Sequence, residues 1–336
     1  PVTAQDFIHS FQRILTPELA SEYAYMLFLM KNAEAYHQGS LKDFSQVGAK
    51  ALAEKQLEIT LSTAAPYFLS LLNHYTWYPV HLKTIEKHGG LYDRSNPWTK
   101  PGNFVGNGPF KLKEWRLNDV LAVEKNPDYW DADTVRLQAI HFYPMESAET
   151  QDRAFRAGRL HNTYEMIPAK IEQYETDSPE ILRKDPYLGS YFYRYNTTEP
   201  PFDDVRVRRA LAMAIDRESI VKNVSRGGQI PANYFTPPST AGYTTRARIP
   251  SDVEAAKALL AEAGYPNGEG FPKASIIFNT SENHRSIAAA IQEMWRKHLN
   301  IEVELNNQEW KVYLDAQRNL QSVSYTHLTL PTICSV

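Results

Sequence analysis

The chain lacks the cysteines that disulfides and thiolate metal sites require. Among its 336 residues there is one cysteine, Cys334. A single cysteine forms no internal disulfide and no thiolate metal cluster. The sequence therefore excludes both kinds of cross-link as a source of stability.

The chain also lacks long hydrophobic runs and an excess of either charge. Its longest apolar stretches, such as 25–30 and 68–72, fall far short of the ~20 residues that cross a bilayer. Its 36 basic and 39 acidic residues leave a net charge of −3. Without a positive field there is no reason to expect nucleic acid or an anionic membrane as partner. We expect no transmembrane helix and a small or neutral partner.

Signatures of common enzymes and metal sites are missing as well. The sequence contains no G-x-S-x-G, H-E-x-x-H, G-x-G-x-x-G or Walker motif. His74, His81 and His88 recur every seven residues, but no carboxylate accompanies them at zinc-site spacing. Pro79 also interrupts the helix that would align them. We therefore predict no catalytic residue, no metal site and no cofactor.

What the sequence does contain is a soluble globular composition rich in tyrosine. Apolar residues make up 43% and aromatic residues 12%, with 20 tyrosines among them. A tyrosine buries a flat ring while its hydroxyl makes hydrogen bonds, which suits a polar-lined cleft and equally a tyrosine-rich core. The length predicts about two domains, at roughly 100–200 residues each.

Local patterns predict a mixed α/β chain. Thr3 with Asp6 has the spacing of a capping box, and apolar residues at helical spacing follow over 7–15. A hairpin is expected from 110–112 and 121–123. In the back half, Ser251 with Glu254 predicts a helix start, and Gly264 the following helix end. Strands at 275–279 and 301–305 flank a helix at 287–295, which favours a partly parallel sheet.

The last residues do not fit this pattern. No charged residue occurs between Asn319 and Val336, and the run SVSYTHLTLPT from Ser322 follows a polar helical stretch without a cap or turn. The run resembles a translated sequencing-library adapter. We interpret 322–336 as a non-native tail and exclude it from fold reasoning; the alternative is a genuine C-terminal strand.

Six separated segments together carry a resemblance to a known family. They resemble, in order, the family 5 extracellular solute-binding proteins of ABC importers, with spacing closest to oligopeptide-binding members. The match runs from Pro1 to about Leu320 in one register. The segments are 1–7 (PVTAQDF), 105–112 (VGNGPFKL), 126–130 (NPDYW), 201–216 (PFDDVRVRRALAMAID), 258–265 (ALLAEAGY) and 307–310 (NQEW).

The resemblance implies an α/β fold of the two-lobe periplasmic-binding-protein type II, or Venus-flytrap, class with an extra subdomain. Residues 1–105 would belong to the extra subdomain of lobe one, 106–189 to lobe one itself and 190–321 to the first part of lobe two. By the same resemblance the fold is incomplete at both ends, and we expect an internal fragment of a longer gene product.

The implied function is that of a receptor rather than an enzyme. Such a protein captures short peptides between its lobes and delivers them to the membrane permease of an ABC importer. We expect a monomer in the periplasm, or a cell-surface lipoprotein. Binding of a dipeptide, a murein peptide or a nickel chelate in the same fold is the nearest alternative. A secreted hydrolase with an Asp/Glu pair is the alternative from a different class.

Three residues match positions that contact the peptide in the family. Tyr23 would reach the peptide, His284 would hold its carboxylate, and Trp310 would form a pocket wall. The motif that contains His284 begins at Asn279, which we include as a peptide-binding candidate. The structural alternatives are a tyrosine packed in the subdomain, a surface histidine capping the next helix and a core tryptophan.

Two positions depart from the family pattern. Where the family has a carboxylate-binding arginine after the tryptophan, this chain has Gln317 with Arg318 beside it. A family lysine is likewise replaced by Ser225 beside Arg226. Arg226 and Arg318 are therefore candidates to supply the missing charge from neighbouring positions, with a solvated surface charge as the alternative for each.

Overall fold

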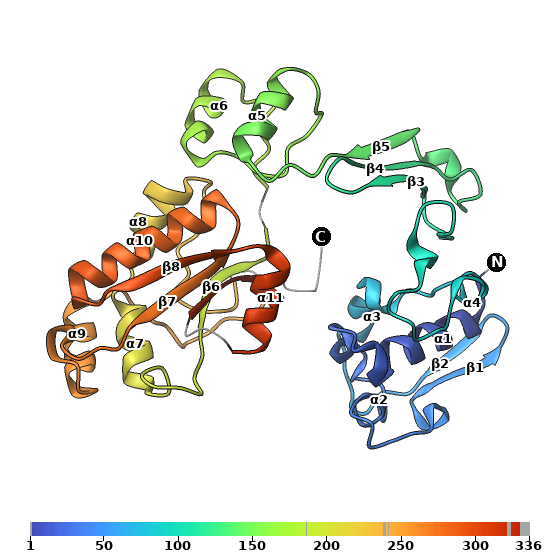
Figure 1. The fold of residues 1–336 in the computed structure, drawn as a ribbon, viewed down its shortest axis with the longest axis horizontal. Coiled ribbons are helices and arrows are strands. Elements are labelled where there is room, and N and C mark those ends of the chain that lie inside the picture. The colour runs from blue at the N-terminus through green and yellow to red at the C-terminus, as the bar shows by residue number, and fades with distance from the viewer. Residues whose placement is uncertain (1, 186, 238–239, 241, 321–323, 330–336) are drawn as a thin grey trace. The chain divides into compact units, whose positions relative to one another are not determined.

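The structure is a computed structural model, and it describes residues 2–185, 187–237, 240, 242–320 and 324–329 (Figure 1). It divides after Pro144 into two compact units. We call the part up to Pro144 unit 1 and the part from Met145 to Pro331 unit 2. The predicted domain boundaries near 105 and 189 rest on the family resemblance and stay a prediction.

Unit 1 begins with the helix that the sequence predicts. Helix α1 covers Ala4–Leu15, and the backbone N–H of Thr3 donates to Asp6 Oδ2 over 2.7 Å, which confirms the capping box. Phe11 and Leu15 on its inner face are fully buried. The ring of Phe11 meets Trp77 edge-on at 5.5 Å in the core of this unit.

Two small antiparallel sheets belong to unit 1. Strands β1 and β2 pair with each other, and β3, β4 and β5 form a meander. The predicted hairpin is confirmed, with Asn118 at φ +58° in the turn between β3 and β4. The remaining elements of this unit are α2 Ala33–His37, β1 Ala49–Ala53, β2 Gln56–Ile59, α3 Phe68–Leu71, α4 Leu82–His88, β3 Phe110–Arg116, β4 Val120–Lys125 and β5 Ala139–Phe142.

Unit 2 begins with a segment that contains helices α5 and α6, called the helical segment below, and continues as an α/β layer structure. Its four-stranded sheet has the order β6-β9-β7-β8. Strand β7 runs parallel to β8 and β9, whereas β6 is antiparallel to β9. The elements are α5 Ala148–Arg156, α6 Ile171–Asp177, β6 Ser190–Tyr195, α7 Val205–Met213, α8 Arg217–Ser219, α9 Val253–Glu262, β7 Ala274–Asn279, α10 Glu282–Leu299, β8 Val303–Gln308, α11 Trp310–Arg318 and β9 Ser324–Thr329.

The two faces of β7 pack against different helices. Ala274, Ile276 and Phe278 belong to the main core with α7, α9 and α10. In that core Trp295 donates from Nε1 to the carbonyl oxygen of Leu211 over 2.9 Å. Ile277 points the other way and packs with residues of α11. Figure 1 shows α10 lying along the β7–β8 pair, and the parallel β7–α10–β8 unit confirms the predicted strand–helix–strand order.

One predicted cap is displaced by a residue. The N-cap of α9 is Asp252, which accepts the N–H of Ala255 over 3.0 Å, rather than Ser251. The Ser251 hydroxyl instead donates to the carbonyl oxygen of Ile215 over 2.6 Å. A tertiary contact therefore takes the side chain that the local pattern assigned to the cap. Gly264 follows the helix at φ +98°, as expected of a C-terminal glycine.

The C-terminal segment contributes a strand. We excluded residues from Ser322 on from the fold, but Ser324–Thr329 forms β9 between β6 and β7. Strand pairing uses backbone groups that every sequence except proline supplies, so it does not depend on where the segment comes from. The interpretation of 322–336 as a non-native tail stays a prediction, and most of that range lies outside the described residues.

Candidate functional site

The parallel strands of unit 2 bring two loops together at one edge of the sheet. Strand β7 ends at Asn279 and β8 at Gln308, and α10 and α11 begin directly after them. A hydrogen bond joins the two loops: the backbone N–H of Thr280 donates to the carbonyl oxygen of Gln308 over 3.0 Å. We call residues 279–284 and 307–310 the carboxyl edge. Ligands of open α/β sheets bind outside the carboxyl ends of the strands.

His284 lies in the first turn of α10 at this edge. Its ring is half-buried and lies 5.6 Å from the ring of Tyr191 on β6. Burial lowers the pKa of His284, and a contact with the Asn279 backbone only partly opposes this. The uncharged imidazole is therefore favoured, and in that form it can donate one N–H but carries no charge.

Several buried polar atoms of the carboxyl edge have no hydrogen-bond partner among the described residues. They are Asn283 Oδ1, His284 Nδ1 and Gln308 Oε1. Buried polar atoms are normally paired, so each unpaired one needs an explanation. Asn283 and Gln308 were missed by our sequence reasoning, although both lie within the quoted motifs at 279–284 and 307–310.

Trp310 opens α11 and is 49% exposed. Its ring stacks on Tyr313 with centroids 5.8 Å apart and an interplanar angle of 18°. Tyr313 is fully buried and supports the indole from behind. The indole therefore presents one flat face at the carboxyl edge instead of packing in a core.

The structure thus brings Asn279, His284 and Trp310 together and leaves Tyr23 in unit 1. There Tyr23 is 38% exposed and contacts three other rings: Tyr25 at 6.1 Å, His74 at 5.3 Å and Tyr75 at 5.6 Å. We call these four residues the aromatic cluster. Burial, together with the hydrogen bond to Tyr23, raises the pKa of Tyr75 to about 12.

Of the two candidate arginines, the structure describes the side chain of Arg226 but not that of Arg318. Arg226 has φ +55°, and its exposed side chain donates from Nε to the carbonyl oxygen of Asn223 over 3.0 Å. Arg318 ends α11, and its side chain lies outside the described residues.

A third cation comes from β6. The guanidinium of Arg194 contacts the side-chain amide of Gln317, with Nη1 2.9 Å from the amide oxygen once the amide is oriented to accept. Arg194 is half-buried, and its Nε has no partner among the described residues. Sequence reasoning missed this residue, because nothing in the local pattern of β6 links it to α11.

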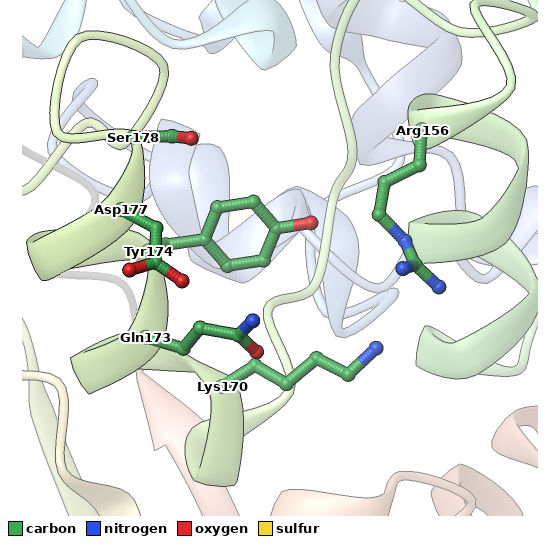
Figure 2. Close-up of a pocket in the computed structure, with 6 residues that line it drawn as sticks. All are labelled: Arg156, Lys170, Gln173, Tyr174, Asp177 and Ser178. Atoms are coloured by element: carbon green, nitrogen blue, oxygen red, sulfur yellow. The ribbon is translucent and has the colours of Figure 1, made fainter.

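A polar pocket of about 220 Å3 lies on the helical segment of α5 and α6. Figure 2 shows the charged ends of Arg156 and Lys170 and the hydroxyl of Tyr174 pointing toward the same space. All three contact the buried carboxylate of Asp152, at 3.2, 2.5 and 2.7 Å respectively. Burial alone would raise the pKa of Asp152, but the bonds from Lys170 and Tyr174 outweigh it and leave that pKa lowered. These cations already have their anion, so the arrangement is a structural network.

No group of three or more His, Cys, Asp or Glu side chains in the described part of the chain is placed to hold a metal ion. None of the described helices is both long and apolar enough to cross a membrane.

Comparison with known proteins identifies relatives of this chain. Over 330 residues it is 37% identical to the periplasmic oligopeptide-binding protein OppA of Salmonella typhimurium, covering 94% of this chain and 59% of that protein. Over 332 residues it is 38% identical to the oligopeptide-binding protein OppA of Bacillus subtilis, covering 94% and 58%. The structure of the murein tripeptide binding protein MppA of Escherichia coli matches with a TM-score of 0.91 and 35% identity, covering 99% and 65%.

These matches confirm the predicted fold class, although the chain spans less than two thirds of each of these relatives. The model of the bacterial extracellular solute-binding proteins, family 5, matches residues 1–327. The resemblance that the six sequence segments indicated is thereby confirmed. The chain belongs to family 5 of the bacterial extracellular solute-binding proteins.

Proposed function

We propose that this chain is part of the substrate-binding receptor of an ABC-type oligopeptide importer. It captures short peptides between two lobes and hands them to a membrane permease. The observation that carries the proposal is the carboxyl edge. Two helices begin there, one indole is exposed, and three buried polar atoms have no hydrogen-bond partner among the residues that the structure describes. The names of the relatives, two oligopeptide-binding proteins and one murein tripeptide binding protein, support peptides as the ligand class.

Each group at the carboxyl edge has a role that peptide chemistry explains. The backbone of a peptide is common to all sequences, so a carrier of many peptides draws its affinity from backbone hydrogen bonds. Asn283, Gln308 and Asn279 offer such bonds, and His284 donates an N–H to the peptide carboxylate. The N-terminal ends of α10 and α11 favour the same negative charge. The face of Trp310 packs against side chains of varied shape.

Tolerance of different side chains calls for room and water. Water bridges are nearly as favourable in enthalpy as direct hydrogen bonds, and they adapt to different groups. Closure of the second lobe would add contacts and shift the population toward the form that a permease recognises. We propose that the protein works as a monomer in the periplasm, or tethered to the cell surface by a lipid.

The nearest alternative is a dipeptide, a murein peptide or a nickel chelate in the same fold. The relatives act by binding solutes, which favours a receptor over the hydrolase alternative.

Mass spectrometry of ligands that co-purify with the full-length gene product tests the proposal. We expect intact peptides of a few residues, and calorimetric binding of the same synthetic peptides after the protein has been freed of ligand. Recovery of only dipeptides or murein peptides would shift the ligand to those classes. Cleavage of an added peptide or glycan, or the absence of any peptide binding, would contradict the receptor.

A further inference from the structure

A pocket of about 400 Å3 lies next to the carboxyl edge in unit 2. Its walls come from the helical segment, chiefly residues 161–167 and 180–183 with parts of α5 and α6. Ligand pockets commonly measure about 300–1,000 Å3, so this one is suited to a single long side chain with water. Glu165 belongs both to the pocket wall and to the surroundings of the edge, because it accepts a hydrogen bond from Ser281 Oγ over 3.3 Å.

The backbone around Glu165 is held firmly. The N–H groups of Tyr164 and Glu165 donate to Gln151 Oε1 over 3.0 and 3.1 Å. Gln151 is buried on α5, and its own amide donates to the carbonyl oxygen of Met145 over 2.8 Å. The chain therefore places the Glu165 carboxylate at a defined point between α5 and the start of α10.

Glu165 is the least solvated unneutralised charge of this pocket. It is half-buried, and it takes part in none of the ion pairs formed by the described residues. Asp152, also in the wall, is already neutralised by Lys170 and Arg156. Glu180 and Arg183 are exposed and of opposite sign. A half-buried carboxylate is screened less by water than an exposed one, so it attracts a cation more strongly.

We propose that this pocket receives a basic side chain of the bound peptide, with the Glu165 carboxylate as its counter-ion. The inference rests on the proposed function and names a substrate preference within it. Met166 and Ile167 in the wall would contact the methylene stem of a lysine, whose charged end would reach Glu165. Ser281 would hold the carboxylate in place from the carboxyl edge.

The test compares peptides that differ in one charge. Calorimetry on the full-length gene product would use alanine peptides that carry one lysine at successive positions, each matched by a peptide with uncharged norleucine. We expect one position at which lysine binds about tenfold more tightly than norleucine, a difference of about 1.4 kcal/mol. In Glu165→Gln that ratio should fall to about one, and in Glu165→Asp it should be intermediate.

Glu172→Gln is the matched control, because Glu172 is an exposed glutamate on α6 of the same segment. It should keep the full lysine preference, and thermal unfolding would verify that all variants fold. Peptide binding without a lysine preference in the native protein, or a preference that survives in Glu165→Gln, overturns the pocket assignment alone. Failure of every peptide to bind contradicts the proposed function itself.

Discussion

The aromatic cluster of unit 1 and the carboxyl edge of unit 2 differ in what they offer to a ligand. The cluster presents ring faces, with Tyr25 at 55% and Tyr75 at 60% exposure. The carboxyl edge contains buried polar atoms without a hydrogen-bond partner in the described part of the chain, and Trp310 is its exposed ring. Ring faces bind many shapes without fixing a direction, whereas hydrogen-bonding groups fix direction and register. In a carrier of many peptides, groups like those of the edge would orient the ligand, and an exposed ring such as Trp310 would tolerate its variety.

The largest expected effect is on the free energy of unfolding, and it distinguishes a substitution in the core of unit 2 from one at its carboxyl edge. Trp295→Ala removes an indole that is 1% exposed and hydrogen-bonded to Leu211. We expect it to lower the free energy of unfolding by about 3–5 kcal/mol. Trp310→Ala, at the half-exposed indole of the edge, should change stability by less than about 1 kcal/mol while weakening peptide binding. Chemical unfolding and calorimetry measure the two effects, and equal loss of stability in both variants would contradict the contrast.

The second prediction concerns the network that supports the helical segment. Asp152→Asn leaves Lys170 beside a neutral amide, and we expect a loss of about 2–3 kcal/mol in the free energy of unfolding. Asp177→Asn, at an exposed carboxylate of the pocket in Figure 2, should have little effect.

The same network predicts that the free energy of unfolding depends on pH in the acid range. Because the pKa of Asp152 is lowered in the folded protein, its contribution is present above the unfolded pKa of about 3.9. It is lost as the pH falls through the lower, folded pKa. The stability difference between native protein and Asp152→Asn should therefore shrink in that acid range. A difference that does not change with pH would contradict the lowered pKa.

The third prediction tests the edge through its histidine. His284→Gln should weaken peptide binding about tenfold, a change of about 1.4 kcal/mol. His298→Gln, in the last turn of the same helix α10, is the control and should bind normally.

Because the pKa of His284 is lowered by burial, its protonation opposes folding. The contribution of the neutral His284 to the free energy of unfolding is complete above the unfolded pKa of about 6.5. It declines as the pH falls from there toward the lower, folded pKa. Unfolding of native protein and His284→Gln at a series of pH values measures this. A native protein that gains stability relative to the variant on acidification would argue against the neutral imidazole.

The fourth prediction compares the cations. Arg194→Gln should weaken binding of peptides with a free carboxylate several-fold, because the half-buried guanidinium forms no ion pair among the described residues and its Nε has no hydrogen-bond partner there. Arg226→Gln changes an exposed side chain and should have a smaller effect. Amidated peptides, which lack the carboxylate, should not distinguish Arg194→Gln from the native protein. The reverse ranking would favour Arg226 as the charge that the sequence comparison anticipated.

The smallest expected effect lies in the aromatic cluster. Tyr23→Phe removes the hydrogen bond and the neighbouring hydroxyl that, after burial, hold up the pKa of Tyr75. The Tyr75 pKa should fall from about 12 toward its ordinary value without reaching it, because burial remains. Ultraviolet titration of tyrosinate reports this shift, and an unchanged titration would show that the two rings are not coupled. Stability should change by less than about 0.5 kcal/mol.

Patterns that depend on neighbours in the chain predicted several elements of the secondary structure. The capping box of Thr3, the hairpin after Phe110 and the parallel strands around α10 are confirmed. One exception is Ser251, whose hydroxyl bonds to Ile215 while Asp252 caps the helix. Local propensity could not reveal that contact, because it joins residues 36 positions apart.

The site residues also differ in whether their contacts are with neighbours in the sequence or with distant residues. Asn279, His284 and Trp310 were found through short motifs whose members are near in sequence, and their roles stay predictions. Arg194 and Glu165 carried no motif. Arg194 was noticed only because its guanidinium contacts Gln317 on α11. Glu165 was noticed only because it accepts a hydrogen bond from Ser281, 116 positions away in the chain.

The amino-acid sequence by itself determined several of the elements, because turn chemistry, helix caps and apolar periodicity act over a few residues. The family and the candidates within its motifs came from the resemblance of six short segments to that family. Tertiary structure alone decided which charges lie half-buried without an ion pair among the described residues, as at Arg194 and Glu165. Desolvation depends on everything that packs around a group, from whichever part of the chain it comes. The strength of an electrostatic interaction follows from that burial, so only the folded chain distinguishes a solvated surface charge from one that attracts a ligand.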